Sequence, residues 1–277
     1  RSRVTLDRPS PLSRAGRVLL LVVVALLWVA PYLWMTVTSL KPLDEIVNAP
    51  AYPLPQKPNL DAYREVMTTV PVGRYLLNTL VMALSIAVLQ IALALPAGYA
   101  LAKLRWRHKP WVFALVVGCL LIPAQVTFVP VFTMLGPTGL INTMGALVIP
   151  FAVSAFGTFL VRQALLSVPV RTIESPRLDG ASELYIVYRI LGPLLAPTLM
   201  AMFLFSFVYH YSDYFWPLVM TTDDESRTLP LAMALLREQG TGERWHVIMA
   251  GNVILSLPVL VVFALAQRHI VRAVASR

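Results

Sequence analysis

The hydrophobic positions of this chain are gathered into long blocks separated by charged or proline-rich segments. A helix needs about 20 consecutive, mostly apolar residues to cross a bilayer. Six blocks meet this length, and they cover residues 17–40, 76–100, 111–135, 141–161, 194–220 and 246–267. The pattern predicts an all-α integral membrane protein with six transmembrane helices.

The first block and the prolines refine this prediction. Residues 17–40 are too long for the core of a signal peptide and lack a small-residue cleavage pattern, so we expect a retained span. Prolines are tolerated in membrane helices when neighbouring helices satisfy the freed carbonyls. We therefore expect kinks, and not helix ends, at Pro31, Pro96, Pro123, Pro130, Pro150, Pro217 and Pro258.

Composition and charge agree with a membrane protein. The chain is 57% hydrophobic and 13% charged, which excludes an ordinary soluble domain, and its net charge of +9 is better explained by membrane topology than by nucleic-acid binding. Sixteen of the 23 lysines and arginines fall in 1–17, in 103–109, in 162–189 and after the last span. Because cytoplasmic segments are enriched in positive charge, both termini are predicted to be cytoplasmic.

These assignments divide the chain into four parts. They are a cytoplasmic tail (1–16), the first transmembrane helix with an outward loop (17–74), a core with five transmembrane helices (75–272) and a second cytoplasmic tail (273–277). The proline-rich part of the first outward loop is expected to be extended and to lead into a short amphipathic stretch at 60–67. A second long outward loop is predicted at 221–245.

The cytoplasmic loop between the fourth and fifth spans, residues 163–193, is named the signature loop below. It predicts two short helices. Pro176 suits a first helical turn capped by Ser175, Asp179-Gly180 favours a turn, and Ser182 can cap a second helix that ends before Gly192. The second helix would expose a surface suited to docking a partner, formed by Leu184, Tyr185 and Tyr188.

The signature loop resembles the E-A-A-x3-G-x9-I-x-L-P signature of ATP-binding-cassette (ABC) importer permeases. The positions that match are Glu174, Gly180, Ile190 and Pro193, and Asp179-Gly180-Ala181 resembles the D-G-A core of carbohydrate permeases. Ser175 and Pro176 depart from the two alanines, and Gly192 departs from the leucine. Segments 122–130, 139–143 and 156–163, together with the D-Y-F-W-P at 213–217, also resemble maltose-type and glycerol-phosphate-type permeases in order and spacing.

This resemblance implies a bacterial cell-membrane permease subunit and a set of partners. They are a second homologous permease, an ABC ATPase dimer that holds ATP and Mg, an extracytoplasmic solute-binding protein and membrane lipid. The loop residues implied in ATPase coupling are Glu174, Asp179, Gly180, Ala181, Ile190 and Pro193. The alternative for this loop is an ordinary solvated connector.

Polar residues inside the predicted spans are candidates for a translocation path. Asp213 is the only acid within a predicted span, where a charge costs about 2.5–3.5 kcal/mol on insertion scales. Helical spacing places it on one face with Ser206, Tyr209, His210 and Trp216, and such an aromatic, polar stripe suits sugars. Further candidates are Gln125, Thr127 and Asn142. The alternative is that these groups bond between helices, that Asp213 pairs with His210 and that Trp216 is an interfacial anchor.

The sequence offers little support for other classes of membrane protein. It has no histidine or acid set at metal-ligand spacing, no G-x-x-x-x-G-K-[ST] loop for ATP and no catalytic cluster, so we predict neither an enzyme nor a bound cofactor. A proton-driven secondary carrier would need several buried acids. The resemblance therefore favours a permease for a sugar, amino sugar or glycerol-phosphate-like solute, with the substrate chosen largely by the binding protein.

Overall fold

A computed structural model describes residues 11–48, 53–239 and 244–275, and within them the regular structure is helical, without β-strands. The all-α class is confirmed. The chain forms two compact units, one made of residues 1–69 and 239–254 and the other of residues 70–238 and 255–277. The predicted N-terminal tail, 1–10 of which lies outside the described residues, is helical from Pro11 onward.

The first unit contains α1 (Pro11–Ser39), α2 (Leu43–Asn48), α3 (Asp61–Thr69) and the first turns of α15 (Trp245–Ala275). Long apolar side chains on α1 are exposed, as expected for a helix surrounded by lipid. The Ser39 and Tyr63 hydroxyls lie 2.7 Å apart and join α1 to α3. The predicted amphipathic stretch therefore exists as α3, whereas the segment expected to be extended contains α2.

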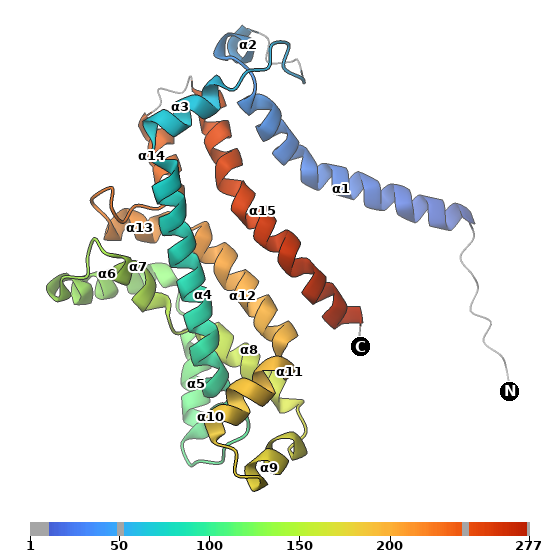
Figure 1. The fold of residues 1–277 in the computed structure, drawn as a ribbon, viewed down its shortest axis with the longest axis vertical. Coiled ribbons are helices and arrows are strands. Elements are labelled where there is room, and N and C mark those ends of the chain that lie inside the picture. Colours follow the sequence, from blue (N-terminus) through green and yellow to red (C-terminus); the bar gives the residue numbers. More distant parts are fainter. Residues whose placement is uncertain (1–10, 49–52, 240–243, 276–277) are drawn as a thin grey trace. The chain divides into compact units, whose positions relative to one another are not determined.

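The frame of the second unit is α4 (Val72–Ala102), which packs along α8 (Ala155–Leu166) and α12 (Ala196–Tyr211) (Figure 1). At Gly98 the backbones approach so closely that an added Cβ would lie 2.6 Å from Val161 Cγ1. A side chain at this position would push α4 and α8 apart.

Helix length alone does not establish six spans. Four described segments are long and apolar enough to cross a membrane: Ala15–Ser39, Val72–Ala102, Met144–Leu166 and Trp245–Ala266. Glu183–Leu194 and Ala196–Tyr211 form a further candidate that is bent by 84°. The predicted third span consists of α5 (Lys109–Cys119) and α6 (Ala124–Leu135).

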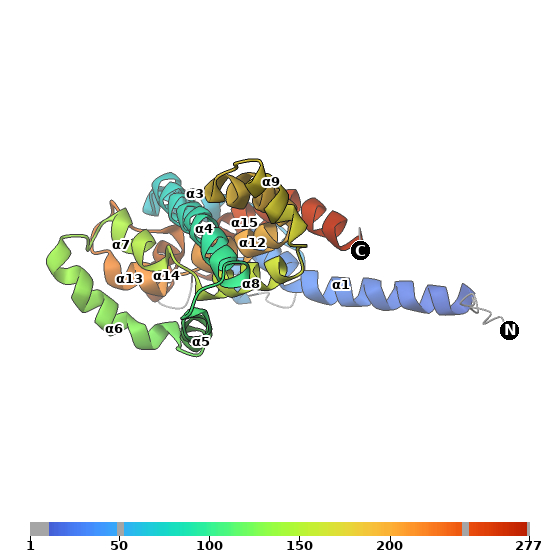
Figure 2. The same cartoon turned by 90° about the horizontal axis from the view of Figure 1, so that it is seen from below.

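The expectation that these prolines do not end helices is confirmed at four positions and wrong at others. Pro31, Pro96, Pro130 and Pro258 lie inside helices. At Pro123, however, the backbone is extended, with ψ 135°, and α5 and α6 run in different directions (Figure 2). Proline has no N–H to donate and disfavours helical geometry in the preceding residue, so the helix stops before it.

The predicted fourth and fifth spans are also interrupted. The fourth consists of α7 (Met144–Val148), the 3₁₀ turn η2 (Ile149–Phe151), which contains Pro150, and α8. In the fifth, α12 ends at Tyr211, and the helix resumes as α13 (Phe215–Met220), which contains Pro217. The 221–245 loop contains a helix that the sequence did not predict, α14 (Leu229–Gln239).

Candidate functional site

The first helix of the signature loop, α9 (Arg171–Leu178), ends in the turn predicted from Asp179-Gly180. Gly180 has φ +84°, and its N–H donates to Arg177 O at 3.2 Å while Ala181 N–H donates to Pro176 O at 3.0 Å. This pair of bonds is a Schellman cap, which requires left-handed geometry at the residue that glycine occupies here.

The predicted start of this helix is wrong. Ser175 and Pro176 do not open α9, which begins at Arg171, and Pro176 lies in its interior. The first turn is closed by earlier residues, since Glu174 N–H donates to Val170 O at 3.1 Å. Pro176 therefore removes one donor from an eight-residue helix without ending it.

The second helix begins as predicted and ends later. Ser182 Oγ accepts the N–H of Tyr185 at 3.3 Å and caps α10 (Glu183–Tyr185). The chain continues through the π-helix η3 (Ile186–Leu191) into α11 (Gly192–Leu194), so the predicted end before Gly192 is wrong. A π-turn changes the helical register directly before Pro193, which has no N–H to donate.

The signature loop is anchored to the spans by its apolar residues. Ile173, Ile186 and Leu191 are buried in one cluster with Tyr99 of α4 and Val161 of α8. Other apolar groups of the loop are exposed, as predicted for Leu184, Tyr185 and Tyr188, and Leu178 is 89% exposed. The loop therefore has one face fixed to the transmembrane helices and one face open.

The residues that match the importer signature lie at different depths of this loop. Glu174, Asp179, Gly180 and Pro193 are exposed. Ala181 and Ile190 are half-buried against the apolar cluster described above. Four of the predicted coupling residues are thus exposed, and two pack at the attachment of the loop.

A polar network that the sequence did not predict joins both halves of the signature loop to α4. Arg177 Nε and Nη2 donate to the two carboxylate oxygens of Glu183 at 2.8 and 3.1 Å. Tyr99 Oη donates to Glu183 Oε2 at 2.5 Å and accepts from Arg177 Nη2 at 2.9 Å. The bond to Glu183 raises the pKa of Arg177, so the guanidinium remains charged at every physiological pH.

A cavity of about 140 Å³ lies at the breaks in the predicted third, fourth and fifth spans. Its walls contain five of the eight residues predicted for a translocation path: Gln125, Thr127, Tyr209, Asp213 and Trp216. The remaining walls are apolar and come from Val131, Pro150, Phe151 and Phe215. Helix breaks of this kind bring polar backbone and side chains to a site within the membrane region.

Asp213 is held by the start of α13. Its Oδ1 accepts the backbone N–H groups of Phe215 and Trp216, the first two residues of α13, at 3.0 and 3.3 Å. Trp216 is buried, donates Nε1–H to Ala146 O at 2.9 Å and packs edge-on against Phe151. Asp213 is therefore a wall residue with a fixed orientation and not a partner of His210, and Trp216 is not an interfacial anchor.

The predicted shared face of five residues is wrong. Because α12 ends at Tyr211, Asp213 and Trp216 do not continue its helical register. Ser206 and His210 are buried away from the cavity walls, and His210 packs its ring 4.8 Å from that of Phe151. Tyr209, by contrast, is 60% exposed and reaches the cavity from the other side of the helix.

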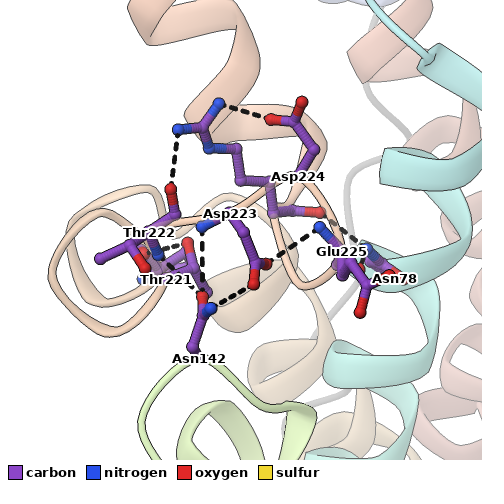
Figure 3. Close-up of polar contacts among 9 residues, drawn as sticks. Asn78, Asn142, Thr221, Thr222, Asp223, Asp224 and Glu225 are labelled. Atoms are coloured by element: carbon purple, nitrogen blue, oxygen red, sulfur yellow. Dashed lines mark hydrogen bonds and ion pairs between the residues drawn. The ribbon is translucent and has the colours of Figure 1, made fainter.

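Asn142 has a structural position outside the cavity walls. It is in the left-handed region with φ 67°, and its Oδ1 accepts the N–H groups of Thr222 and Asp223 at 2.8 and 3.2 Å. Its Nδ2 donates to the Asp223 carboxylate (Figure 3). On the other side of the same loop, Asn78 of α4 donates to the carbonyls of Glu225 and Arg227. Two asparagines thus hold residues 222–227.

Apolar helices broken around a partly polar cavity are typical of membrane proteins that move solutes. Residues 94–276 match the family described as "Binding-protein-dependent transport system inner membrane component". The chain belongs to this family, whose members are multi-pass components of the bacterial plasma membrane and permeases of ABC transporters, not enzymes.

Individual relatives are named as permease proteins of transport systems. The chain is 31% identical over 205 residues to the sn-glycerol-3-phosphate transport system permease protein UgpE of Pectobacterium atrosepticum, covering 74% of this chain and 73% of the relative. It is 28% identical over 268 residues to the arabinooligosaccharides transport system permease protein AraQ of Bacillus subtilis, covering 93% and 92%.

A solved structure shares the fold. A chain from the crystal structure of a bacterial ABC transporter involved in the import of the acidic polysaccharide alginate superposes with a TM-score of 0.81 at 23% identity. The match covers 95% of this chain and 99% of that chain. The protein is accordingly a permease subunit of an ABC importer.

Proposed function

We propose that this chain forms half of the translocation path of an ATP-driven importer for an uncharged carbohydrate. Its partners would be a second permease, an ABC ATPase dimer and a solute-binding protein outside the membrane. In this assignment both termini and the signature loop are cytoplasmic, the open face of α9 and α10 docks on the ATPase, and ATP and Mg bind to that partner.

The composition of the cavity wall supports this substrate class. Asp213 is the only charged residue among the nine that line it, and no lysine or arginine is among them. The Asp213 carboxylate, the amide of Gln125 and the rings of Phe151 and Trp216 can bind hydroxyl groups and the apolar faces of a sugar. A phosphate or uronate would instead be recognised by a cationic group.

A proton-coupled carrier is less well supported by the same wall. Such carriers usually use several interacting buried ionisable groups. Here the Asp213 carboxylate is tied to the backbone of α13 and has no acidic neighbour in the cavity wall. The cavity therefore favours solute contact over a proton relay.

Purification of this chain from detergent-solubilised native membranes tests the proposal. We expect an ABC ATPase and a second permease to co-purify, with ATP hydrolysis stimulated by the solute-binding protein loaded with a neutral oligosaccharide. Glycerol 3-phosphate, tested in parallel, should not stimulate hydrolysis. A chain that purifies alone would contradict the subunit assignment, and stimulation by glycerol 3-phosphate only would contradict the substrate class.

A further inference from the structure

The network of Tyr99, Arg177 and Glu183 lies beside the turn between α9 and α10, at the point where the signature loop meets α4. Arg177 lies in the last turn of α9 and Glu183 opens α10, so their paired charges close the Asp179–Ser182 turn. Each charge also has the sign that stabilises its own helix end. The two halves of the loop are thereby held as one body.

Tyr99 joins this body to the transmembrane frame. Its ring is 3% exposed and lies in the same apolar cluster as Ile173, Ile186 and Leu191, whereas its hydroxyl reaches the ion pair. Arg177 and Glu183 themselves are about half-exposed, and an ion pair in such a position alone contributes little. The buried hydroxyl adds a charge-assisted hydrogen bond that fixes the orientation of the pair relative to α4.

Two contacts near Tyr99 also link α4 to the signature loop and to α8, so that α4 can follow a movement of the loop. Tyr188 Oη donates to Ala92 O at 2.8 Å, two helical turns from Tyr99 along α4. At Gly98, next to Tyr99, α4 packs so closely against Val161 of α8 that a side chain would not fit, as described above. A movement of the loop would therefore displace α4, and α8 with it, because both contacts are direct.

We infer that Tyr99, Arg177 and Glu183 are the positioning residues that transmit movement of the signature loop to α4 during transport. None of the three is a fixed position of the importer signature. The inference rests on the proposed function, because it requires a partner ATPase that moves the loop. Without the Tyr99 hydroxyl, the loop can follow the ATPase while α4 lags behind, and ATP is hydrolysed without solute crossing.

The test uses the complete transporter, with its partner permease, ATPase and binding protein, reconstituted in proteoliposomes. Tyr99→Phe keeps the ring in the apolar cluster and removes only the hydroxyl. We expect solute uptake per ATP hydrolysed to fall about tenfold, the loss expected for one charge-assisted hydrogen bond. Basal ATP hydrolysis and recovery of the assembled complex should be unchanged.

Two further variants make the result decisive. Tyr32→Phe makes the same chemical change at an exposed tyrosine of α1 and should keep the wild-type ratio. Glu183→Gln keeps an acceptor but removes the charge, so we expect a smaller fall in solute uptake per ATP hydrolysed. If Tyr99→Phe fails to assemble, the result for Glu183→Gln tests the inference in its place. A wild-type ratio in both Tyr99→Phe and Glu183→Gln would overturn the inference. A wild-type complex without stimulated ATP hydrolysis would instead refute the proposed function.

Discussion

The two ends of the second unit are built by different means. At the signature-loop end, α4 and α8 are uninterrupted and meet the loop in one apolar cluster that contains Tyr99, Ile186 and Leu191. At the cavity end, the helices break near Pro123, Pro150 and Asp213, and polar side chains bonded to backbone groups hold the pieces. Continuous helices with apolar packing transmit displacement, whereas broken helices leave polar groups available to a solute.

This contrast indicates that the two ends respond differently to substitution. Apolar clusters resist deformation, because their packing is dense and any gap or overlap is costly. Side chain–backbone bonds at helix breaks are individually modest and can be exchanged for bonds to water or ligand. Changes that distort the signature loop should therefore impair coupling most strongly, while changes at the cavity should alter transport by degrees.

The largest effect is expected for Gly180→Leu. Leucine in left-handed geometry costs about 1–2 kcal/mol, and its side chain would project from the open face of the loop. Uptake in membrane vesicles should fall to background while the chain remains inserted in the membrane. Gly180→Asn is the matched control, since asparagine tolerates positive φ, and it should keep most of the uptake. Normal uptake by Gly180→Leu would show that the turn is not needed for coupling.

Asn142→Ala should loosen the 222–227 segment at the opposite end. The change removes two accepted backbone bonds and leaves a non-glycine residue at φ 67°, a loss of about 2–4 kcal/mol. Trypsin cleavage after Arg227 in purified protein should become at least about 30-fold faster. Asn142→Gly, which tolerates the backbone geometry, should show a smaller increase. Equal cleavage of Asn142→Ala and wild type would mean that other contacts hold the loop.

Asp213→Asn should change transport without loss of the protein from the membrane. Asparagine Oδ1 can still accept the N–H groups of Phe215 and Trp216, so the bonds to the start of α13 are kept while the charge at the cavity is removed. We expect the concentration for half-maximal uptake to rise about three- to tenfold, the loss of one charged hydrogen bond to solute. Unchanged uptake kinetics would mean that Asp213 only holds the start of α13.

The smallest effect is expected for Pro176→Ala. Alanine restores the missing N–H within α9 and fits its helical backbone, so uptake should stay within about twofold of wild type. A modest rise in thermal stability of the purified chain should accompany the change. A severe transport defect would show that the geometry imposed by the proline is required at the docking face.

The sequence predicted what depends on local signals. The apolar blocks identified the all-α class, the Asp179-Gly180 pair identified the left-handed cap, and Ser182 identified the start of α10. The predicted shared face of the translocation path required a helix that continues past Tyr211. It is wrong because α12 ends there. Local spacing cannot show where a proline interrupts a helix, because neighbouring helices decide whether the freed carbonyls are satisfied.

Long-range contacts account for the rest. Tyr99 and Glu183 are 84 positions apart, and Asn142 and Thr222 are 80 positions apart. Nothing in the composition around Tyr99 indicates a polar partner, since it lies in a nearly continuous apolar helix. The one available signal was the opposite charge of Arg177 and Glu183 on the two sides of a predicted turn.

Uptake of a radiolabelled neutral oligosaccharide by proteoliposomes containing the complete transporter tests the central claim most directly. The account predicts uptake that requires ATP on the signature-loop side and the solute-binding protein on the other, with no response to an imposed proton gradient. Uptake by this chain alone, driven by a proton gradient without ATP, would contradict it.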